Sequence, residues 1–294
     1  MKKVSVIIPA YNHEKFIGDA ISSVLESNYQ NIEVIVIDDG STDNTKQVVS
    51  SFKDVLYHHQ QNFGAHNAIN RGVSMASGEL IAILNDDDKF FKDHLSVAVS
   101  NLDTFGNSLF VGKGEVFGEG PKLELLKNHI LSSVTIVEEY GWVLSLFKIN
   151  WSISTSSFVF DKELFIKLGG FHGFALCHDL DFLLRALLVE NVSVGTSDSL
   201  TWLYRCHETN SGSSINAIKQ SSEIIYTLCR VLGPIIDEIS SDNLLSLIGH
   251  GLSPNISLLA AREKPWLREV SSTVDHSIAE WITLCEDSKL DLLI

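Results

Sequence analysis

The sequence predicts an α/β fold in which a mostly parallel sheet is flanked by helices and followed by a helical C-terminal region. The first hundred residues alternate short β-branched runs with amphipathic segments, as strand–helix–strand units do. The β-branched runs are almost continuously apolar, which is typical of strands covered on both faces. After about residue 215, strand-like runs are rare and amphipathic helical patterns dominate.

The first half of the sheet follows from the order of these segments. A β-branched run ends at Pro9, which is typical of the end of a strand. From Phe16 to Leu25, apolar residues recur every three or four positions, which indicates an amphipathic helix. A later segment opens with Ser41 and Thr42, which are both good helix-capping residues. Strands are therefore expected at residues 3–9, 32–38, 55–59 and 80–84, with helices at 16–25, 41–52 and 65–75.

The second half of the chain is less regular. It contains short apolar runs among glycine-rich turns, together with one longer helical stretch. Strands are expected at residues 108–112, 114–118 and 156–160, and a helix at 138–147.

Composition limits the classes of function. The 294 residues are 45% apolar and 20% charged, with a net charge of −15, which is ordinary for a soluble protein and argues against nucleic-acid partners and a basic membrane surface. No apolar run approaches the roughly 20 residues of a transmembrane segment. The N-terminal run is also too short for a signal peptide. The cytoplasm is the expected location, with a peripheral position on the inner face of the membrane left open.

Three consecutive carboxylates, Asp86, Asp87 and Asp88, directly follow the fourth predicted strand. Ligands of parallel α/β sheets bind at the carboxyl ends of the strands. Mg²⁺ and Mn²⁺ take carboxylate and phosphate oxygens as ligands there, and a bound cation would offset the repulsion among the three charges. The alternative is a solvated acidic turn. The position of the three carboxylates beside a second acidic loop favours the metal site over this alternative.

That second loop contains Asp38 and Asp39 and follows the second predicted strand. Helix capping by Ser41 or Thr42 explains part of its composition. Two carboxylates before the cap exceed what capping requires. One of them could accept a hydrogen bond from a nucleotide base or from ribose hydroxyls.

In order and spacing, several motifs resemble the nucleotide-binding half of a family 2 glycosyltransferase of the GT-A fold, whose Rossmann-like sheet is mostly parallel. They are VSVIIPAYN, VIVIDDGSTDNT, NFGAHNAINRG and GELIAILNDDD. Three later segments, SSFVFDKELFIKLGGF, HDLDFLLR and YRCHETNSGS, resemble motifs of the family's acceptor side and donor-phosphate region. The resemblance covers roughly residues 1 to 215. It implies a nucleotide-sugar-binding half at 1–105, an acceptor-binding and catalytic half at 106–214, and a helical region at 215–294.

The resemblance also implies roles for residues on the donor side. Pro9 and Tyr11 would line the base pocket, Asp39 would accept a hydrogen bond from the base, and Asn70 lies in the third motif, among the donor-binding residues. In the family's D-x-D motif the second aspartate binds the metal, and that position is Asp87 here.

The first aspartate of this motif is replaced by Asn85, which puts the expected ribose contact in doubt. The neighbouring Asp86 could supply that contact instead. Asp88 is the commonly acidic neighbour and a further metal candidate. The sequence leaves the register of the three carboxylates open.

The later motifs imply the catalytic groups. Asp179 corresponds to the family's catalytic base, although His178 stands where a glutamate is usual. The alternative is that Asp179 caps the following helix, the structural role we expect for Asp181, which would point toward Arg185. Arg205 and His207 are two apart in an extended segment, so their side chains face the same way and suit a diphosphate or its metal; packing is the alternative for His207. The other histidines, including His13, show no ligand spacing.

Together these features imply a metal-dependent, inverting glycosyltransferase that uses Mn²⁺ or Mg²⁺. Its donor would be a nucleotide sugar, with UDP as the expected nucleotide. Its acceptor would be a hydroxyl of a saccharide, a lipid-linked glycan or another molecule in polysaccharide synthesis. The helical tail could support a homo-oligomer.

Two other classes stay open. A non-catalytic nucleotide-sugar-binding protein on the same scaffold would explain Asn85 and His178. A nucleotidyltransferase is disfavoured, because the loop PAYNHEKF is neither glycine-rich nor basic.

Overall fold

The computed structural model describes residues 1–106, 108–120, 122–131, 133, 137, 154–208 and 210. Almost all of them belong to one compact unit, formed by Met1–Ser132 and Ser152–Ser214. The helix predicted at 138–147 and the helical region predicted at 215–294 lie outside the described residues. Within the described part of the chain, no helix has the length and apolar character needed to cross a bilayer.

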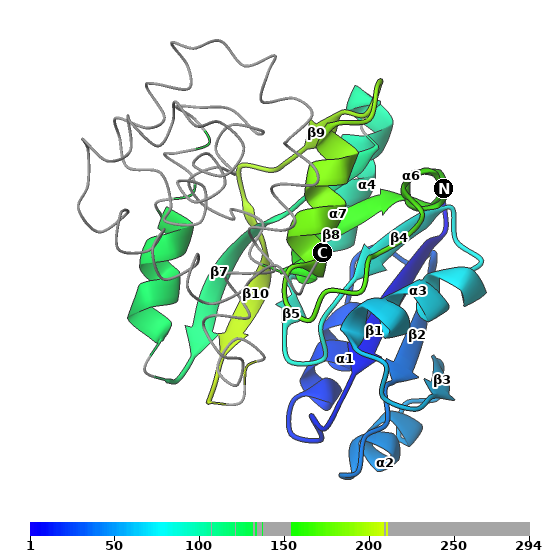
Figure 1. Cartoon of the computed structure of the whole chain (residues 1–294), viewed down its shortest axis with the longest axis vertical. Coiled ribbons are helices and arrows are strands. Elements are labelled where there is room, and N and C mark those ends of the chain that lie inside the picture. The colour runs from blue at the N-terminus through cyan, green and yellow to red at the C-terminus, as the bar shows by residue number, and fades with distance from the viewer. Residues whose placement is uncertain are drawn as a thin grey trace, which may run out of the picture. The chain divides into compact units, whose positions relative to one another are not determined.

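A seven-stranded sheet forms the centre of this unit, in the order β3-β2-β1-β4-β8-β6-β9 (Figure 1). The first four strands in this order are parallel, whereas β8 runs antiparallel to both of its neighbours. The mostly parallel sheet is confirmed. All seven predicted strands are present with small shifts at their ends; the strand predicted at 114–118 belongs to a second sheet, and the other six belong to this one. The strands of this sheet are β1 (Val4–Ala10), β2 (Ile32–Asp38), β3 (Val55–His59), β4 (Leu80–Ile83), β6 (Leu109–Val111), β8 (Phe158–Asp161) and β9 (Val194–Gly195).

The three predicted N-terminal helices are present as α1 (Ile17–Leu25), α2 (Thr45–Ser50) and α3 (Ala65–Met75). The structure adds α4 (His94–Phe105), which the sequence analysis missed although buried apolar residues recur along it at helical spacing. Later in the chain lie α6 (Lys162–Leu168), α7 (His178–Leu187) and the short 3₁₀ helix η1 (Thr155–Ser157). Residues 123–131 are also helical.

Helices cover both faces of the sheet, which is why its strands are apolar throughout. The even-numbered residues of β1 pack in one cluster with the buried faces of α1 and α4. Helix α3 packs against the other face, where a Cβ added to Gly72 would lie 2.3 Å from the side chain of Ile7. This glycine therefore allows α3 to approach β1 closely.

A second, smaller sheet consists of β5 (Lys89–Phe90), β10 (Leu200–Cys206) and β7 (Lys113–Gly118). The central strand β10 is antiparallel to β5 and parallel to β7. Buried Trp202 fixes its position, donating from its indole nitrogen to the Gly112 carbonyl over 2.9 Å. Because β5 directly follows the three consecutive carboxylates, this sheet brings Arg205, His207 and Asn210 next to the acidic loop.

Candidate active site

The carboxyl ends of β1, β2 and β4 lie together at one edge of the sheet. In the strand register, Ala10 is level with Asp38, and Ile7 is level with Ile83. The backbone nitrogen of Asp39 donates to the Ala10 carbonyl over 2.8 Å. The two acidic loops therefore lie at the same edge, as expected, together with the loop that follows β1.

Side chains join these loops to one another. Asp86, in the loop after β4, accepts hydrogen bonds from the Tyr11 backbone nitrogen at 2.9 Å and the His13 ring Nδ1 at 2.7 Å. Asn12 connects the loop after β1 with the loop after β2, through Ser41 and Thr42. The edge is thus a hydrogen-bonded assembly rather than three independent loops.

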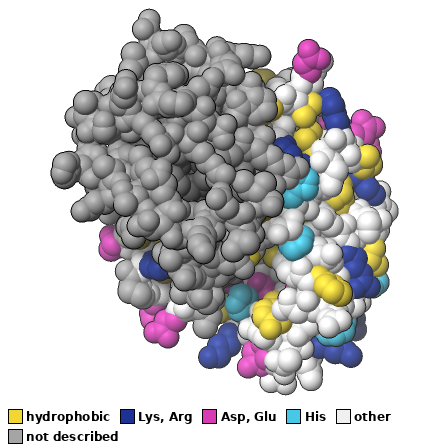
Figure 2. Space-filling view, in the orientation of Figure 1, with side chains coloured by type: hydrophobic (Ala, Val, Ile, Leu, Met, Phe, Trp, Pro, Cys, Tyr) yellow, Lys and Arg dark blue, Asp and Glu magenta, His cyan; other side chains and the backbone are white. Residues whose placement is uncertain are grey.

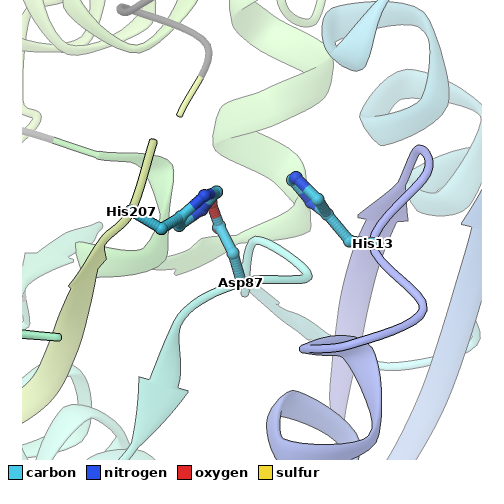
Figure 3. A group of neighbouring side chains, drawn as sticks. All are labelled: His13, Asp87 and His207. Atoms are coloured by element: carbon cyan, nitrogen blue, oxygen red, sulfur yellow. The ribbon is translucent and has the colours of Figure 1, made fainter. Parts of the chain in front are cut away.

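Three potential metal ligands converge at this edge (Figure 3). Each of His13, Asp87 and His207 offers one ligand atom, and these atoms lie within 4.8 Å of one another. The His207 Nε2 is 2.9 Å from the Asp87 Oδ2. The three residues come from the loop after β1, the loop after β4 and the segment after β10, with the His13 ring directed toward the other two from the opposite side (Figure 3).

Negatively charged side chains surround His13, and their charge favours a cation at this position. The pKa of His13 rises to about 9: burial lowers it, but the hydrogen bond to Asp86 and the negative charges of Asp86, Asp87 and Asp43 outweigh that effect. These carboxylates attract positive charge, which either a proton on His13 or a bound divalent ion can supply. Figure 2 shows several histidine side chains reaching the described surface of the molecule in that view.

Aromatic packing restrains the two histidines and the neighbouring arginine. Phe16 contacts both His13 and His207, with ring centroids 5.7 and 4.6 Å away. The Arg205 guanidinium lies between the rings of Phe16 and Phe117, at 4.9 and 4.5 Å. It also donates to the Asp87 carbonyl at 2.7 Å and to Asp19 at 2.7 Å. Arg205 therefore supports the acidic loop directly.

Asp88 faces a different set of partners from Asp87. It is 1% exposed and accepts hydrogen bonds from the hydroxyls of Ser154 and Ser156 and from the Arg205 backbone nitrogen. Burial, and then the charge of Asp87, raise the pKa of Asp88 well above its usual value, against the effect of these donors. The structure does not bring Asp88 into the group of three potential ligands.

Asn85, which stands where the family has the first aspartate, is also engaged by the segment at η1. Its side chain donates to the Ser154 hydroxyl at 3.0 Å and accepts from the Thr155 hydroxyl at 2.9 Å. Asn85 and Asp88 thus join the acidic loop to residues 154–156, at η1.

The residues expected at the base pocket differ in exposure. Pro9 is buried within β1, and the Tyr11 side chain is 47% exposed. Asp39 is buried and accepts hydrogen bonds from the Gln60 side chain and from the backbone nitrogens of Phe63 and Gly64, at 2.7 to 3.0 Å. Asp39 therefore shapes the 60–64 loop beside the strand ends. The three bonds that it accepts here are fewer than the roughly four that a carboxylate can accept.

Asn70 contacts the acceptor-side segment. Its amide donates to the Phe171 carbonyl and its oxygen accepts from the Phe171 nitrogen, both at 2.8 Å. The adjacent Gly170 has φ +81°, and a Cβ there would lie 2.9 Å from the Asn70 Oδ1. Among the described contacts, those of Asn70 join α3 to this turn instead of the acidic loop.

Asp179 lies in the first turn of α7 and is buried, and its Oδ1 accepts from the Leu180 nitrogen at 2.7 Å. It lies within electrostatic range of Tyr204, whose pKa is raised by burial and then by nearby negative charges that include Asp88, Asp87 and Asp179. Asp181 pairs with Arg185 at 2.6 Å, which confirms its expected direction.

Sequence reasoning missed two residues of this site. His13 was dismissed for lack of ligand spacing, but it lies in the ligand group. Asn210 accepts a hydrogen bond from the His207 nitrogen at 2.7 Å and so positions that residue. Only the order of strands β1 and β4 in the sheet could have indicated the proximity of His13, because no local spacing relates it to Asp87.

The donor atoms fit a divalent transition-metal ion. Imidazoles suit transition-metal ions such as Fe²⁺ and Zn²⁺, whereas a carboxylate suits Mn²⁺ and Mg²⁺. Two ligands on one ion are about 4.4 Å apart at most, given metal–nitrogen bonds of about 2.0–2.2 Å. Ligands at tetrahedral or right angles on such an ion lie roughly 3.0–3.6 Å apart. The three atoms here lie within 4.8 Å of one another, so binding one ion requires a side-chain movement of at most about 2 Å.

Comparisons with known proteins identify the family of this chain. The family model described as "Glycosyl transferase family 2" matches residues 5–169, which is more than half of the chain. A glycosyltransferase of Rickettsia typhi is 31% identical over 195 residues, covering 64% of this chain and 60% of the relative. A Campylobacter jejuni GalNAc(5)-diNAcBac-PP-undecaprenol beta-1,3-glucosyltransferase is 35% identical over 130 residues, which cover 40% and 42% of the two chains. The chain thus spans less than two thirds of the length of these relatives.

Solved structures share the fold. S. aureus TarS 1-349 in complex with UDP-GlcNAc matches with a TM-score of 0.60 at 22% identity, covering 78% of this chain and 67% of that chain. The mannosyltransferase PcManGT from Pyrobaculum calidifontis, in complex with GDP-Man and Mn2+, matches with a TM-score of 0.56 at 17% identity, covering 96% and 83%. The chain therefore has the GT-A fold and belongs to glycosyl transferase family 2.

Proposed function

We propose that this protein is a metal-dependent, inverting glycosyltransferase that moves a sugar from a nucleoside diphosphate, with UDP as the expected nucleotide, to a hydroxyl acceptor. The observation that carries this proposal is the 2.9 Å contact between Asp87 and His207, which lie at the carboxyl edge of the parallel strands although 120 residues separate them in the sequence. A carboxylate and an imidazole at this edge can hold Mn²⁺ or Mg²⁺ beside a bound diphosphate.

The metal would supply Lewis-acid stabilisation of the negative charge that develops on the leaving diphosphate. The solved relative bound to GDP-Man and Mn2+ supports this assignment by analogy, as does the relative bound to UDP-GlcNAc for a uridine nucleotide. The Tyr11 side chain is exposed at the end of β1, where it can pack on a base. Asp39 shapes the neighbouring loop.

On the acceptor side, Asp179 is the proposed general base. The acceptor hydroxyl must lose its proton as it attacks the sugar C1, and a carboxylate within hydrogen-bond reach can take that proton. Attack opposite the leaving diphosphate inverts the configuration at C1 and needs no covalent enzyme intermediate. The acceptor class is a saccharide or a lipid-linked glycan, and the undecaprenol-linked substrate named for the Campylobacter relative supports the second choice.

The test compares Asp179→Asn with wild type in transfer and in donor hydrolysis. We expect transfer to fall by about 10²–10⁴-fold, since a general base contributes about that much, while nucleotide binding is retained. Asp198→Asn, at an exposed position, is the matched control and should leave transfer unchanged. Undiminished transfer by Asp179→Asn would reject this residue as the base. Nucleotide binding without turnover on any acceptor would favour the non-catalytic alternative.

A further inference from the structure

We propose that His13 is a third protein ligand of the metal and that Asp86 holds its ring in place, so that the site binds a divalent transition-metal ion before any nucleotide arrives. This inference rests on the proposed function, because it concerns the same metal. A site that holds its metal through Asp87 and His207 alone does not require His13 or Asp86. The inference gives both of these residues a role.

The first step is the position of His13. Its ligand atom lies within 4.8 Å of those of Asp87 and His207. The His13 and His207 rings are 5.4 Å apart and nearly perpendicular, at 87°. They therefore do not stack on each other, and both border the space beside the Asp87 carboxylate (Figure 3).

The second step concerns the ring nitrogens. The His13 Nδ1 is 2.7 Å from the Asp86 Oδ1, and this carboxylate is nearly buried, with 8% of its side chain exposed. An acidic acceptor favours a proton on Nδ1, so the lone pair of the neutral ring is on Nε2. Carboxylate–histidine–metal arrangements of this kind orient the ring and increase the basicity of the ligand.

The third step is the rigidity of this arrangement. The second oxygen of Asp86 accepts from the Tyr11 nitrogen at 2.9 Å, so the carboxylate is held from two directions. The His13 backbone nitrogen donates to the Thr45 hydroxyl at 3.2 Å. Phe16 packs against both imidazoles. The ligands are thus positioned by contacts within the protein, without a contribution from a nucleotide.

Asp86 occupies the middle position of the D-x-D motif, between Asn85 and Asp87. A carboxylate at this position is not needed for metal binding by Asp87. Its pairing with His13 gives it a physical role, and this pair is the feature that would distinguish the site from one that has only Asp87 and His207 as protein ligands.

The experiment is titration of Mn²⁺ into the nucleotide-free full chain, followed by calorimetry and by pulsed electron paramagnetic resonance of the bound ion. We expect one Mn²⁺ per chain and nitrogen couplings from two imidazoles. His13→Gln should weaken Mn²⁺ binding at least tenfold and remove one imidazole coupling. Asp86→Asn should weaken binding by about 10–100-fold, the usual effect of losing the partner of a ligand histidine.

His58→Gln, in β3, is the matched control and should bind Mn²⁺ like wild type. Thermal unfolding of every variant in EDTA shows whether its fold is intact. The inference is overturned if His13→Gln, intact by this criterion, retains the wild-type affinity and both couplings, or if wild type binds Mn²⁺ only when UDP is present.

Separate measurements of UDP binding and donor turnover distinguish the two proposals. Two-histidine Mn²⁺ binding without any nucleotide binding would support the inference and reject the proposed function. Mn²⁺-dependent transfer by a His13→Gln variant with unchanged metal affinity would support the proposed function and reject the inference.

Discussion

Replacing Asn70 by alanine distinguishes a structural role for this residue from the donor-binding role that its motif implies. Its side chain makes two hydrogen bonds of 2.8 Å to the backbone of buried Phe171. Each such bond contributes about 1 kcal/mol net to stability. Loss of both should therefore lower the free energy of unfolding by about 2 kcal/mol, or somewhat more if the freed groups of Phe171 stay out of reach of water.

For a chain of this size, that loss corresponds to a fall in Tm of roughly 3–4 °C. Differential scanning calorimetry measures this change, and calorimetric titration with UDP and Mn²⁺ measures donor binding. The matched control is Asn67→Ala, on an exposed position of α3 where the side chain accepts one bond of 3.2 Å from Gln60. We expect the control to stay close to wild type in both measurements.

The expected result for Asn70→Ala is a lower Tm with UDP affinity within about twofold of wild type, because its contacts lead to the acceptor-side turn. An unchanged Tm combined with at least a tenfold loss of UDP affinity would refute this reasoning. Asn70 would then bind the donor, as the motif implies.

Other predictions concern the sheet and the metal. Hydrogen bonds from Ser5, Lys3 and Ser77 outweigh the effect of burial and lower the pKa of Glu33 to about 2; the lowered value stabilises the fold above about pH 4.5, and this contribution is lost as the pH falls toward 2. Urea unfolding should accordingly show Glu33→Gln less stable than wild type at pH 7, with the difference shrinking between pH 4.5 and 2; a constant difference would contradict this. Gly72→Ala should cost about 1–3 kcal/mol through overpacking against β1, whereas an unchanged urea midpoint would show that α3 moves away freely. Saturating Mn²⁺ should raise Tm by mass action and EDTA should reverse the rise; no shift in Tm would argue against a metal site in the folded protein.

The sequence was sufficient to predict the parallel half of the sheet, because continuous apolar runs separated by amphipathic segments have few other solutions. Residues 32–38 form the expected strand without any change of bounds. Helix α4 carried a similar apolar pattern and was overlooked. The second sheet could not be predicted, because β10 pairs with β7 across about 90 residues and neither segment indicates its partner.

The candidate site was predictable only in the part that depends on the parallel sheet. The position of the acidic loops at one edge follows from the parallel sheet, and the resemblance to family 2 drew attention to Asp87 and His207. The separate surroundings of Asp86, Asp87 and Asp88 depend on distant partners. His13 is 73 residues from Asp86 in the sequence, and Ser156 is 68 residues from Asp88. Such pairings arise from tertiary packing, so the order of the carboxylates alone does not specify them.

The most direct test of the central claim is release of nucleoside diphosphate from a panel of UDP-, GDP- and dTDP-sugars, with Mn²⁺ or with EDTA. Wild type is compared with Asp87→Asn and with the control Asp54→Asn, at an exposed position. We predict Mn²⁺-dependent release of one nucleotide, strongest for UDP, that EDTA and Asp87→Asn abolish and Asp54→Asn preserves. Equal release in EDTA, or no release and no binding of any nucleotide, would contradict a metal-dependent nucleotide-sugar site at this edge of the sheet.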